Sequence, residues 1–147
     1  MRKKRYAGFT LIELMIAVAI IAIVVRLAYG QYTSQFTRAK RSAVESFMVQ
    51  VAAREEQAML NSRAYFAIAA GTVAQWSAVN ITVPAEVGSN YTVTVAANNA
   101  ATPPSYTITA TPQGKQASND TTCGVLTYNQ AQTKTAAGSG GVANCWR

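Results

Sequence analysis

The stretch Gly8-Phe9-Thr10-Leu11-Ile12-Glu13 decides the architecture of this 147-residue chain. It follows a basic leader, Met1-Arg2-Lys3-Lys4-Arg5, and opens residues 9–25, in which only Thr10 and Glu13 are not apolar. Seventeen residues of helix rise about 25 Å, close to the thickness of bilayer hydrocarbon. The pattern therefore predicts a membrane helix with its basic end in the cytoplasm.

Glu13 is the exceptional residue of this helix. An ionised carboxylate near the lipid core costs roughly 2–4 kcal/mol on insertion scales, so such a residue usually faces a partner. Cleavage between Gly8 and Phe9 would create an α-amine one helical turn from Glu13. The amine of a neighbouring chain, shifted along the helix axis, can approach the carboxylate more freely than the amine of the same chain. The charge of Glu13 therefore predicts an assembly in which helices pack side by side, each shifted along its axis relative to the next. The alternative is a single-pass membrane anchor in which Glu13 has no role.

The N-terminal segment resembles the class III signal of type IV prepilins, with its basic leader, Gly8, Phe9 and an apolar run that contains Glu13. The resemblance implies cleavage after Gly8 by a prepilin peptidase, N-methylation of Phe9 and burial of the helix in a filament core. It also implies that Glu13 guides docking to the Phe9 amine of an adjacent subunit. The partners implied are other pilin subunits, the inner-membrane pilus assembly machinery and, before assembly, the membrane.

Two positions depart from the pilin pattern. Gly30 stands where the family usually has a helix-kinking proline, and Arg26 stands where it usually has a small apolar residue. Glycine lowers helix stability by about 1 kcal/mol relative to alanine, so we expect a weak point or bend near Gly30. Arg26 can snorkel to the far bilayer surface before assembly, but inside a filament it needs an acid or carbonyl partner that the sequence does not identify.

The chain length supports a membrane helix and one small globular domain. We expect a leader at residues 1–8, a transmembrane and filament-core helix at residues 9–30, and a periplasmic globular domain at residues 31–147. This places the chain in the inner membrane before assembly and in the cell-surface pilus afterwards. The formal charge of +7 falls to +3 in the mature chain, because four of the thirteen basic residues lie in the leader. That excess is modest for an anionic partner.

The globular domain combines a second helical segment with strands. Residues 31–62 carry an apolar stripe at three- and four-residue steps, formed by Phe36, Ala39, Ala43, Phe47 and Val51. The charged residues that flank this stripe are Arg38, Lys40, Arg41, Glu45, Arg54, Glu55 and Glu56. We expect Arg38, Lys40 and Arg41 to lie on a solvated face; the alternative is contact with a nucleic acid or a neighbouring subunit. Residues 91–95 and 106–110 alternate as half-buried antiparallel strands. Residues 125–128 follow as a third strand, residues 129–132 as a turn and residues 133–135 as a fourth strand.

The predicted fold class is therefore α+β, the type IV pilin fold. A long N-terminal helix packs on a small antiparallel β-sheet with a C-terminal disulfide-closed region, and residues 61–90 form a connection without an assigned structure. Cys123 and Cys145 are the only cysteines, and an oxidising compartment with an even count favours a disulfide over two free thiols. Two cysteines in a chain without histidine supply too few ligands for a zinc site, and we expect no metal and no cofactor.

The C-terminal region carries a second resemblance. The segment from Cys123 to Gln130 and the terminal Cys145-Trp146 are similar to minor pilins of the PilE type, a group related to the DNA-uptake pilin ComP. For such relatives the resemblance implies DNA binding by basic residues around the cysteine-closed loop. The candidates in this sequence are Lys115, Lys134 and Arg147. Strong salt-dependent binding to DNA usually uses more than three cations.

An enzymatic function is not expected, because the chain has no histidine for general-base chemistry, scattered acids and thiols that are expected to be joined. Three functions remain. The first is a structural, minor subunit of a type IV pilus that supports pilus biogenesis, twitching motility, adhesion or DNA uptake. The second is a DNA-uptake receptor among the minor pilins, and the third is a pseudopilin of type II secretion. The terminal cysteine pair favours a pilin over a pseudopilin.

Overall fold

The computed structural model describes residues 9–146, so the expectations for Gly8 and Arg147 fall outside the described residues. Its longest element is helix α1, Leu11–Ser62. The chain divides between Phe36 and Thr37 into two units, which we call the helical unit, Met1–Phe36, and the globular unit, Thr37–Arg147. The expected boundary at residue 31 lies inside α1.

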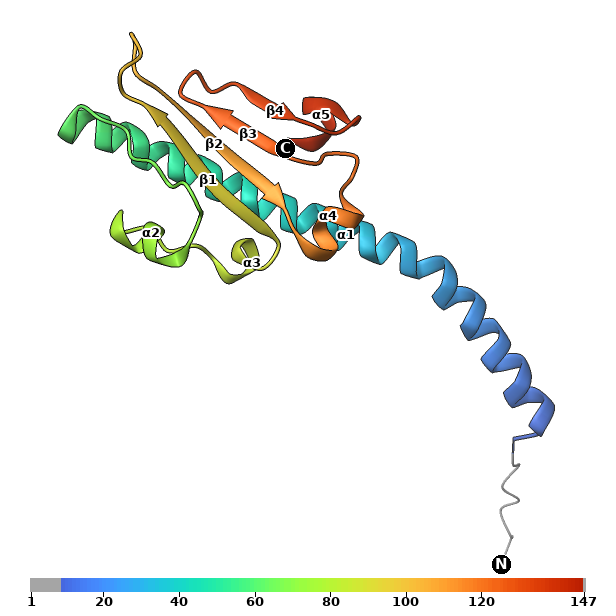
Figure 1. The fold of residues 1–147 in the computed structure, drawn as a ribbon. Helices are drawn as coiled ribbons and strands as arrows, with labels where there is room; N and C mark the ends of the chain where they lie inside the picture. The colour runs from blue at the N-terminus through green and yellow to red at the C-terminus, as the bar shows by residue number, and fades with distance from the viewer. Residues whose placement is uncertain (1–8, 147) are drawn as a thin grey trace, which may run out of the picture. The chain divides into compact units, whose positions relative to one another are not determined.

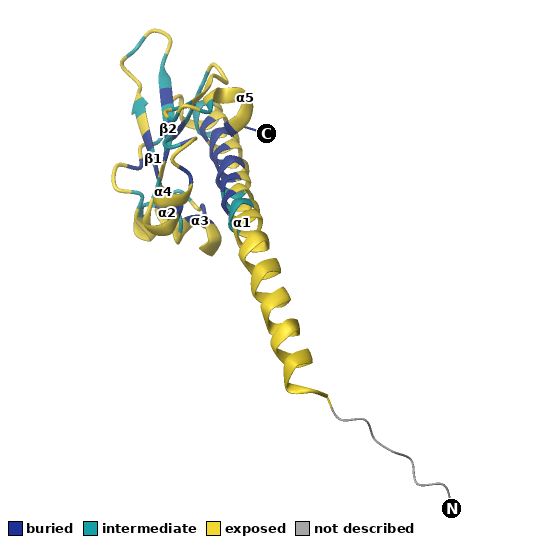
Figure 2. Cartoon of the chain, turned by 90° about the vertical axis from the view of Figure 1, so that its right-hand side faces the viewer, coloured by how far each residue is buried: buried dark blue, intermediate teal, exposed yellow. Residues whose placement is uncertain are grey.

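In the helical unit, α1 begins at Leu11 and runs without interruption through Gly30. The Thr33 hydroxyl donates to the carbonyl oxygens of Tyr29 at 3.2 Å and Gly30 at 3.0 Å. The apolar side chains of residues 11–27 are all exposed, as the yellow N-terminal part of α1 in Figure 2 shows. By length and composition α1 is long and apolar enough to cross a membrane. The described part of this unit therefore leaves a large apolar surface uncovered.

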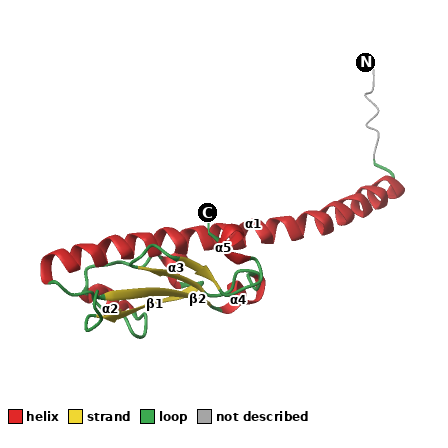
Figure 3. Cartoon of the chain, turned by 90° about the horizontal axis from the view of Figure 1, so that it is seen from above, coloured by secondary structure: helices red, strands yellow, loops and turns green. Residues whose placement is uncertain are grey.

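In the globular unit, the second part of α1 lies along one face of a four-stranded antiparallel sheet (Figures 1 and 3). The strands are β1 Tyr91–Asn98, β2 Ser105–Pro112, β3 Leu126–Asn129 and β4 Lys134–Ala136, and they pair in the order β1-β2-β3-β4. Every neighbour in the sheet is also the next strand in the sequence, and the connection from β2 to β3 contains helix α4, Gly114–Asn119. The predicted helix-on-sheet arrangement and its four strands are confirmed.

Local sequence explains how the long helix ends and how the last turn forms. The Arg63 N–H donates to the Met59 carbonyl at 3.0 Å, and Arg63 adopts a left-handed φ of 54°, which stops the helix. Between β3 and β4 the Asn129 side chain accepts from the N–H groups of Ala131 at 3.0 Å and Thr133 at 2.9 Å. An asparagine that bonds to the backbone just after it favours such a turn.

The core of the globular unit lies between α1 and the sheet. The alternating residues expected to face the helix are all buried, with exposed fractions of at most 3%: Tyr91, Val93, Val95, Tyr106 and Ile108. From α1 they meet Val44, Phe47, Met48 and Val51, which belong to the same apolar cluster.

Residues 61–90, which the sequence left unassigned, contain helices α2 Val73–Ala78 and α3 Ala85–Gly88. The buried ring of Trp76 meets Phe47 of α1 edge-on, with centroids 5.3 Å apart. Ile68 adds a short bridge to Val95 on the outer side of β1. Two further helices, α4 Gly114–Asn119 and α5 Gly141–Cys145, flank the last two strands in the sequence and were not predicted.

The buried face of α1 differs from the predicted stripe. Phe36, expected in the core, is 50% exposed and contacts Tyr32, with ring centroids 4.6 Å apart. Arg41, expected on a solvated face, is only 9% exposed. The face that packs on the sheet consists of Thr37, Arg41, Val44, Glu45, Phe47, Met48, Val51, Ala52 and Glu55. Phe47 and Val51 of the expected stripe are buried and Ala43 packs against the core, so the prediction was wrong only at Phe36 and Ala39. It also missed the charged residues of this face, because it grouped only apolar residues.

Candidate functional site

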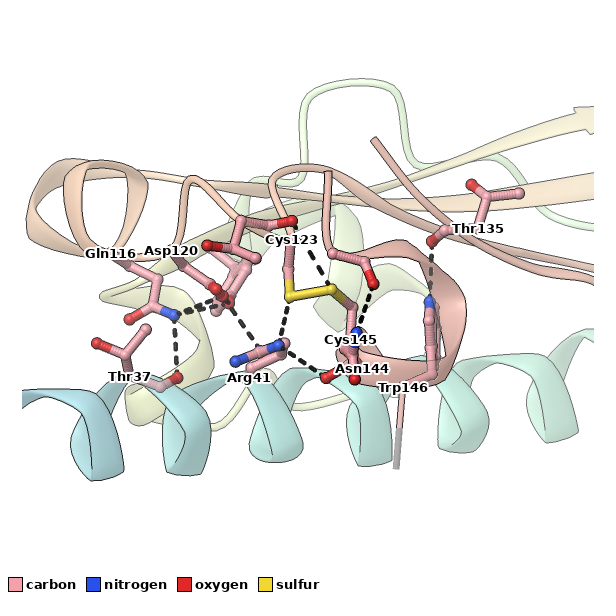
Figure 4. The surroundings of a disulfide bond; sticks show 12 residues. Thr37, Arg41, Gln116, Asp120, Cys123, Thr135, Asn144, Cys145 and Trp146 are labelled. Atoms are coloured by element: carbon pink, nitrogen blue, oxygen red, sulfur yellow. Dashed lines mark hydrogen bonds and ion pairs between the residues drawn. A yellow bond between two sulfur atoms is a disulfide. The ribbon is translucent and has the colours of Figure 1, made fainter. Parts of the chain in front are cut away.

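The C-terminal region is closed by the disulfide between Cys123 and Cys145, as predicted for the fold (Figure 4). Both cysteines are at least 98% buried. The backbone of the enclosed loop folds back on itself, since the Gly140 N–H donates to the Thr122 carbonyl at 2.8 Å and the Gly138 N–H donates to the Cys123 carbonyl at 2.9 Å. A side chain at Gly138 would meet the Thr122 carbonyl, so this crossing requires a glycine.

A buried polar network fastens this closed region to α1. The Arg41 Nε lies 3.3 Å from a carboxylate oxygen of Asp120, and the Arg41 guanidinium also contacts the Cys123 Sγ and the Asn144 carbonyl (Figure 4). The Gln116 Nε2 donates to the Thr37 carbonyl at 3.1 Å, which ties α4 to the start of the globular unit. The charged pair is thus compensated within the fold.

The protonation of this network follows from its burial. Burial raises the pKa of Asp120, and the nearby Arg41 guanidinium opposes that shift. Tyr91 completes the cluster, because its hydroxyl accepts from Gln116 at 2.9 Å and donates to Asp120 at 3.3 Å. Burial also raises the pKa of Tyr91. Arg41 is therefore occupied by internal contacts and is not a surface cation.

Lys134 lies at the edge of the sheet beside the C-terminal tryptophan. Its Nζ is 5.2 Å from the centre of the Trp146 ring, and the Trp146 Nε1 donates to the Thr135 carbonyl at 2.8 Å. A cavity of about 270 Å³ is lined by Lys134, Trp146 and Glu45. Its lining therefore contains one base, Lys134, and one acid, Glu45. Lys134 itself is exposed. Lys115, the second candidate, is exposed on α4.

Burial makes the surface of the globular unit more basic than its composition indicates. Of its described acids, Glu45, Glu55 and Asp120 are buried, and only Glu56 and Glu86 are exposed. The exposed or half-buried bases of the same unit are Arg38, Lys40, Arg54, Arg63, Lys115 and Lys134. The surface of the described part of this unit therefore carries six bases and two acids. This distribution supports contact with an anionic partner more strongly than the net charge of the sequence.

Glu55 is a buried acid of α1 that the sequence analysis placed on the flanks of the apolar stripe. Its side chain is 0% exposed, and its Oε2 accepts from the Phe66 N–H at 3.0 Å. Its Oε1 has no hydrogen-bond partner among the described residues. Burial raises the pKa of Glu55 to about 7, the Phe66 N–H opposes this shift, and the nearby Glu56 adds to it.

At the other end of the chain, Phe9 and Glu13 are exposed in the described part of the helical unit. The Thr10 hydroxyl accepts from the Glu13 N–H at 3.3 Å, as in an N-cap. The Glu13 carboxylate is thus open to a partner outside the chain. Gly8, the expected cleavage position, and Arg147, the third candidate cation, lie outside the described residues.

An apolar helix with a solitary acid, joined to a helix-on-sheet unit with a C-terminal disulfide, defines a type IV pilin. The comparisons with known proteins agree. Residues 30–127 match the family described as "Type IV minor pilin ComP, DNA uptake sequence receptor", and residues 3–26 match the "Prokaryotic N-terminal methylation motif". The first match covers more than half of the chain, which therefore belongs to that family of minor pilins.

A solved structure supports the fold. The chain is 17% identical to the protein of "High-Resolution Structure of a Type IV Pilin from Shewanella oneidensis", with a TM-score of 0.51. The match covers 76% of this chain and 98% of that chain. No curated protein matches the chain.

The prediction of a pilus subunit is confirmed: the chain is a type IV minor pilin, and pilins are structural proteins. Membership implies assembly with other pilins, and the methylation motif implies processing by a prepilin peptidase. The N-terminal motif and the apolar helix fit membrane anchoring before assembly and the pilus afterwards.

Sequence reasoning missed the Arg41 network and Glu55. A signal for both was present, since residues 37, 41, 44, 48, 51 and 55 recur at three- and four-residue steps. This spacing was missed because we included only apolar residues in the predicted core stripe.

Proposed function

We propose that this minor pilin joins a type IV pilus through its exposed N-terminal helix, after leader cleavage between Gly8 and Phe9. The observation that carries the proposal is the uncovered apolar surface of residues 11–27, interrupted in its first turns by the exposed Glu13. In a filament the carboxylate of Glu13 pairs with the Phe9 amine of an adjacent subunit. Before assembly the helix crosses the inner membrane once, and the globular unit faces the periplasm, where the inner-membrane assembly machinery receives it.

The test of assembly compares Glu13→Ala with Glu13→Asp in cells that make pili. We expect Glu13→Ala to be membrane-inserted and cleaved yet poorly incorporated, because the amine of its neighbour loses its counter-charge. Glu13→Asp keeps the charge and serves as the matched control. Incorporation of Glu13→Ala into sheared filaments at the wild-type level would remove the role given to the carboxylate.

The processing step is tested separately with Gly8→Val. A branched side chain should not fit a peptidase site that accepts glycine, so the leader should remain attached. Mass spectrometry of the N-terminus distinguishes the two products, and also reports methylation of Phe9. Efficient cleavage of the variant would contradict the assignment of Gly8.

A second function, reception of DNA during uptake, is supported by two observations. The family is named for a DNA uptake sequence receptor, and the globular unit exposes more bases than acids. We assign phosphate contacts to Lys115, Lys134 and Arg147 near the disulfide-closed region. Since each neutralised phosphate of duplex DNA contributes a slope of about −0.9 in log affinity against log salt, the number of contacts is measurable.

The test titrates the mature chain, held in a non-ionic detergent, with a labelled duplex at several salt concentrations. Lys115→Ala with Lys134→Ala should weaken binding and make the salt slope shallower by about 2. Arg54→Ala with Arg63→Ala is the matched control, since it removes two exposed charges near the C-terminal end of α1. Absence of binding by the wild type at low salt would leave only the structural role.

A further inference from the structure

Arg26 is a cation of the helical unit that forms no ion pair with any of the described residues. The structure exposes its side chain, and among the described residues it makes no hydrogen bond or ion pair. The only acid of residues 9–36 is Glu13, thirteen residues earlier. That spacing corresponds to about 20 Å along the helix, too far for an arginine side chain to span.

The surroundings of Arg26 change when the helix leaves the membrane. In a bilayer, a cation near the end of an apolar helix reaches the headgroup region with its flexible stem. In a bundle of helices those phosphates are gone, and an unpaired buried ion is strongly destabilising. A filament position that accepts this chain must therefore supply a partner for Arg26.

The charges of the mature helical unit limit which protein can supply that partner. After cleavage the helical unit carries the Phe9 amine, Glu13 and Arg26, which is two positive charges for one negative charge. A filament of identical copies leaves one positive charge per subunit, even if every Glu13 is paired. The helical unit of a second copy therefore has no spare carboxylate for Arg26.

We propose that Arg26 is an assembly residue that pairs with a carboxylate on the apolar helix of a different pilin, one whose helix carries more acid than its amine neutralises. The chain would then enter the filament next to a different pilin, and not next to a copy of itself. The inference rests on the proposed packing of the helix in a filament, and it adds a contact separate from the one between Glu13 and the Phe9 amine.

The first experiment replaces Arg26 in the full chain, expressed with the other pilins of its host. Arg26→Lys keeps the charge, whereas Arg26→Leu removes it and leaves the partner's carboxylate unpaired. We expect copies per filament, normalised to the cleaved chain in the membrane, to fall at least tenfold for Arg26→Leu and to stay within about twofold for Arg26→Lys. Equal incorporation of wild type and Arg26→Leu would overturn the inference. Absence of the wild type from filaments would instead contradict the proposed function.

The second experiment identifies the neighbour with a photo-reactive phenylalanine analogue at Tyr29. Tyr29 is exposed and lies three residues after Arg26, hence on the same face of α1. We expect cross-links in filaments to a peptide from the apolar helix of another pilin that contains an acid. Cross-links only to copies of this chain, or to pilin segments without an acid, would overturn the heteromeric assignment.

Discussion

Replacing Glu55 with glutamine should remove a pH dependence from the stability of the globular unit. In the folded chain the carboxyl is fully buried, with one oxygen bonded to the Phe66 N–H and the other unpaired among the described residues. Burial raises its pKa from an ordinary 4.5 to about 7. The charged groups facing this site are few: Glu56 adds to the shift, and no base forms an ion pair with Glu55 in the described part of the chain.

The direction in which the free energy of unfolding changes with pH follows from proton linkage. Below pH 4.5 the carboxyl is protonated whether the unit is folded or unfolded, so it contributes no pH dependence. Between pH 4.5 and 7 the unfolded chain releases the proton and the folded chain keeps it, so the free energy of unfolding falls as pH rises. A difference of about 2.5 pH units corresponds to a loss of up to about 3 kcal/mol, complete above pH 7.

The assay is urea unfolding of the mature chain in a non-ionic detergent, followed by tryptophan fluorescence at several pH values. Both tryptophans, Trp76 and Trp146, are buried in the globular unit, so the signal reports the unfolding of that unit. Wild type should lose stability from pH 5 to pH 8 relative to Glu55→Gln. Glu56→Gln changes an exposed neighbour in the same way and is the matched control. Parallel profiles for wild type and Glu55→Gln would refute the reasoning.

Three further perturbations test the packing of the closed C-terminal region and the core. Arg41→Ala leaves Asp120 buried without its counter-charge and should cost about 3–5 kcal/mol in urea unfolding, whereas a loss below about 1 kcal/mol would mean that Asp120 finds another partner. Replacing both Cys123 and Cys145 by alanine opens a bridge between residues 22 apart and should cost about 3 kcal/mol in the chain-entropy model. Wild type under reducing conditions should then match the double variant, and a difference between them would contradict this account. Met48→Ala truncates a side chain with 0% exposure and should cost about 2–5 kcal/mol, with Val49→Ala on the exposed side of the same helix as its control.

The strands of the globular unit were predictable because their signals are local. Alternation of apolar and polar residues over residues 91–95 and 106–110 fixes which side chains face the core, since successive side chains of a strand point to opposite faces. The turn at Asn129 was also visible, because asparagine bonds to the backbone that follows it. The order of the sheet, in which each strand pairs with the next, was not predicted, and β2 and β3 are joined through α4.

The helices α2, α4 and α5 were not predictable in the same way. Each has six residues or fewer, which is too short to be stable by itself or to show a clear period. Trp76 of α2 is held by the ring of Phe47, and Gln116 of α4 is held by the Thr37 carbonyl of α1. These contacts join residues about 30 and about 80 positions apart, and no local pattern encodes them.

The sequence by itself determined the long helix, the four strands, the cysteine pair and the N-terminal motif of a pilin, because each depends on residue type at short spacing. Only the tertiary structure decided which charges the surface keeps. It buried Arg41 against Asp120 and enclosed Glu55 beside Phe66, while Lys115 and Lys134 stayed exposed. The physical reason is that the fate of a charge depends on the partner that folding brings to it, and those partners come from distant parts of the chain.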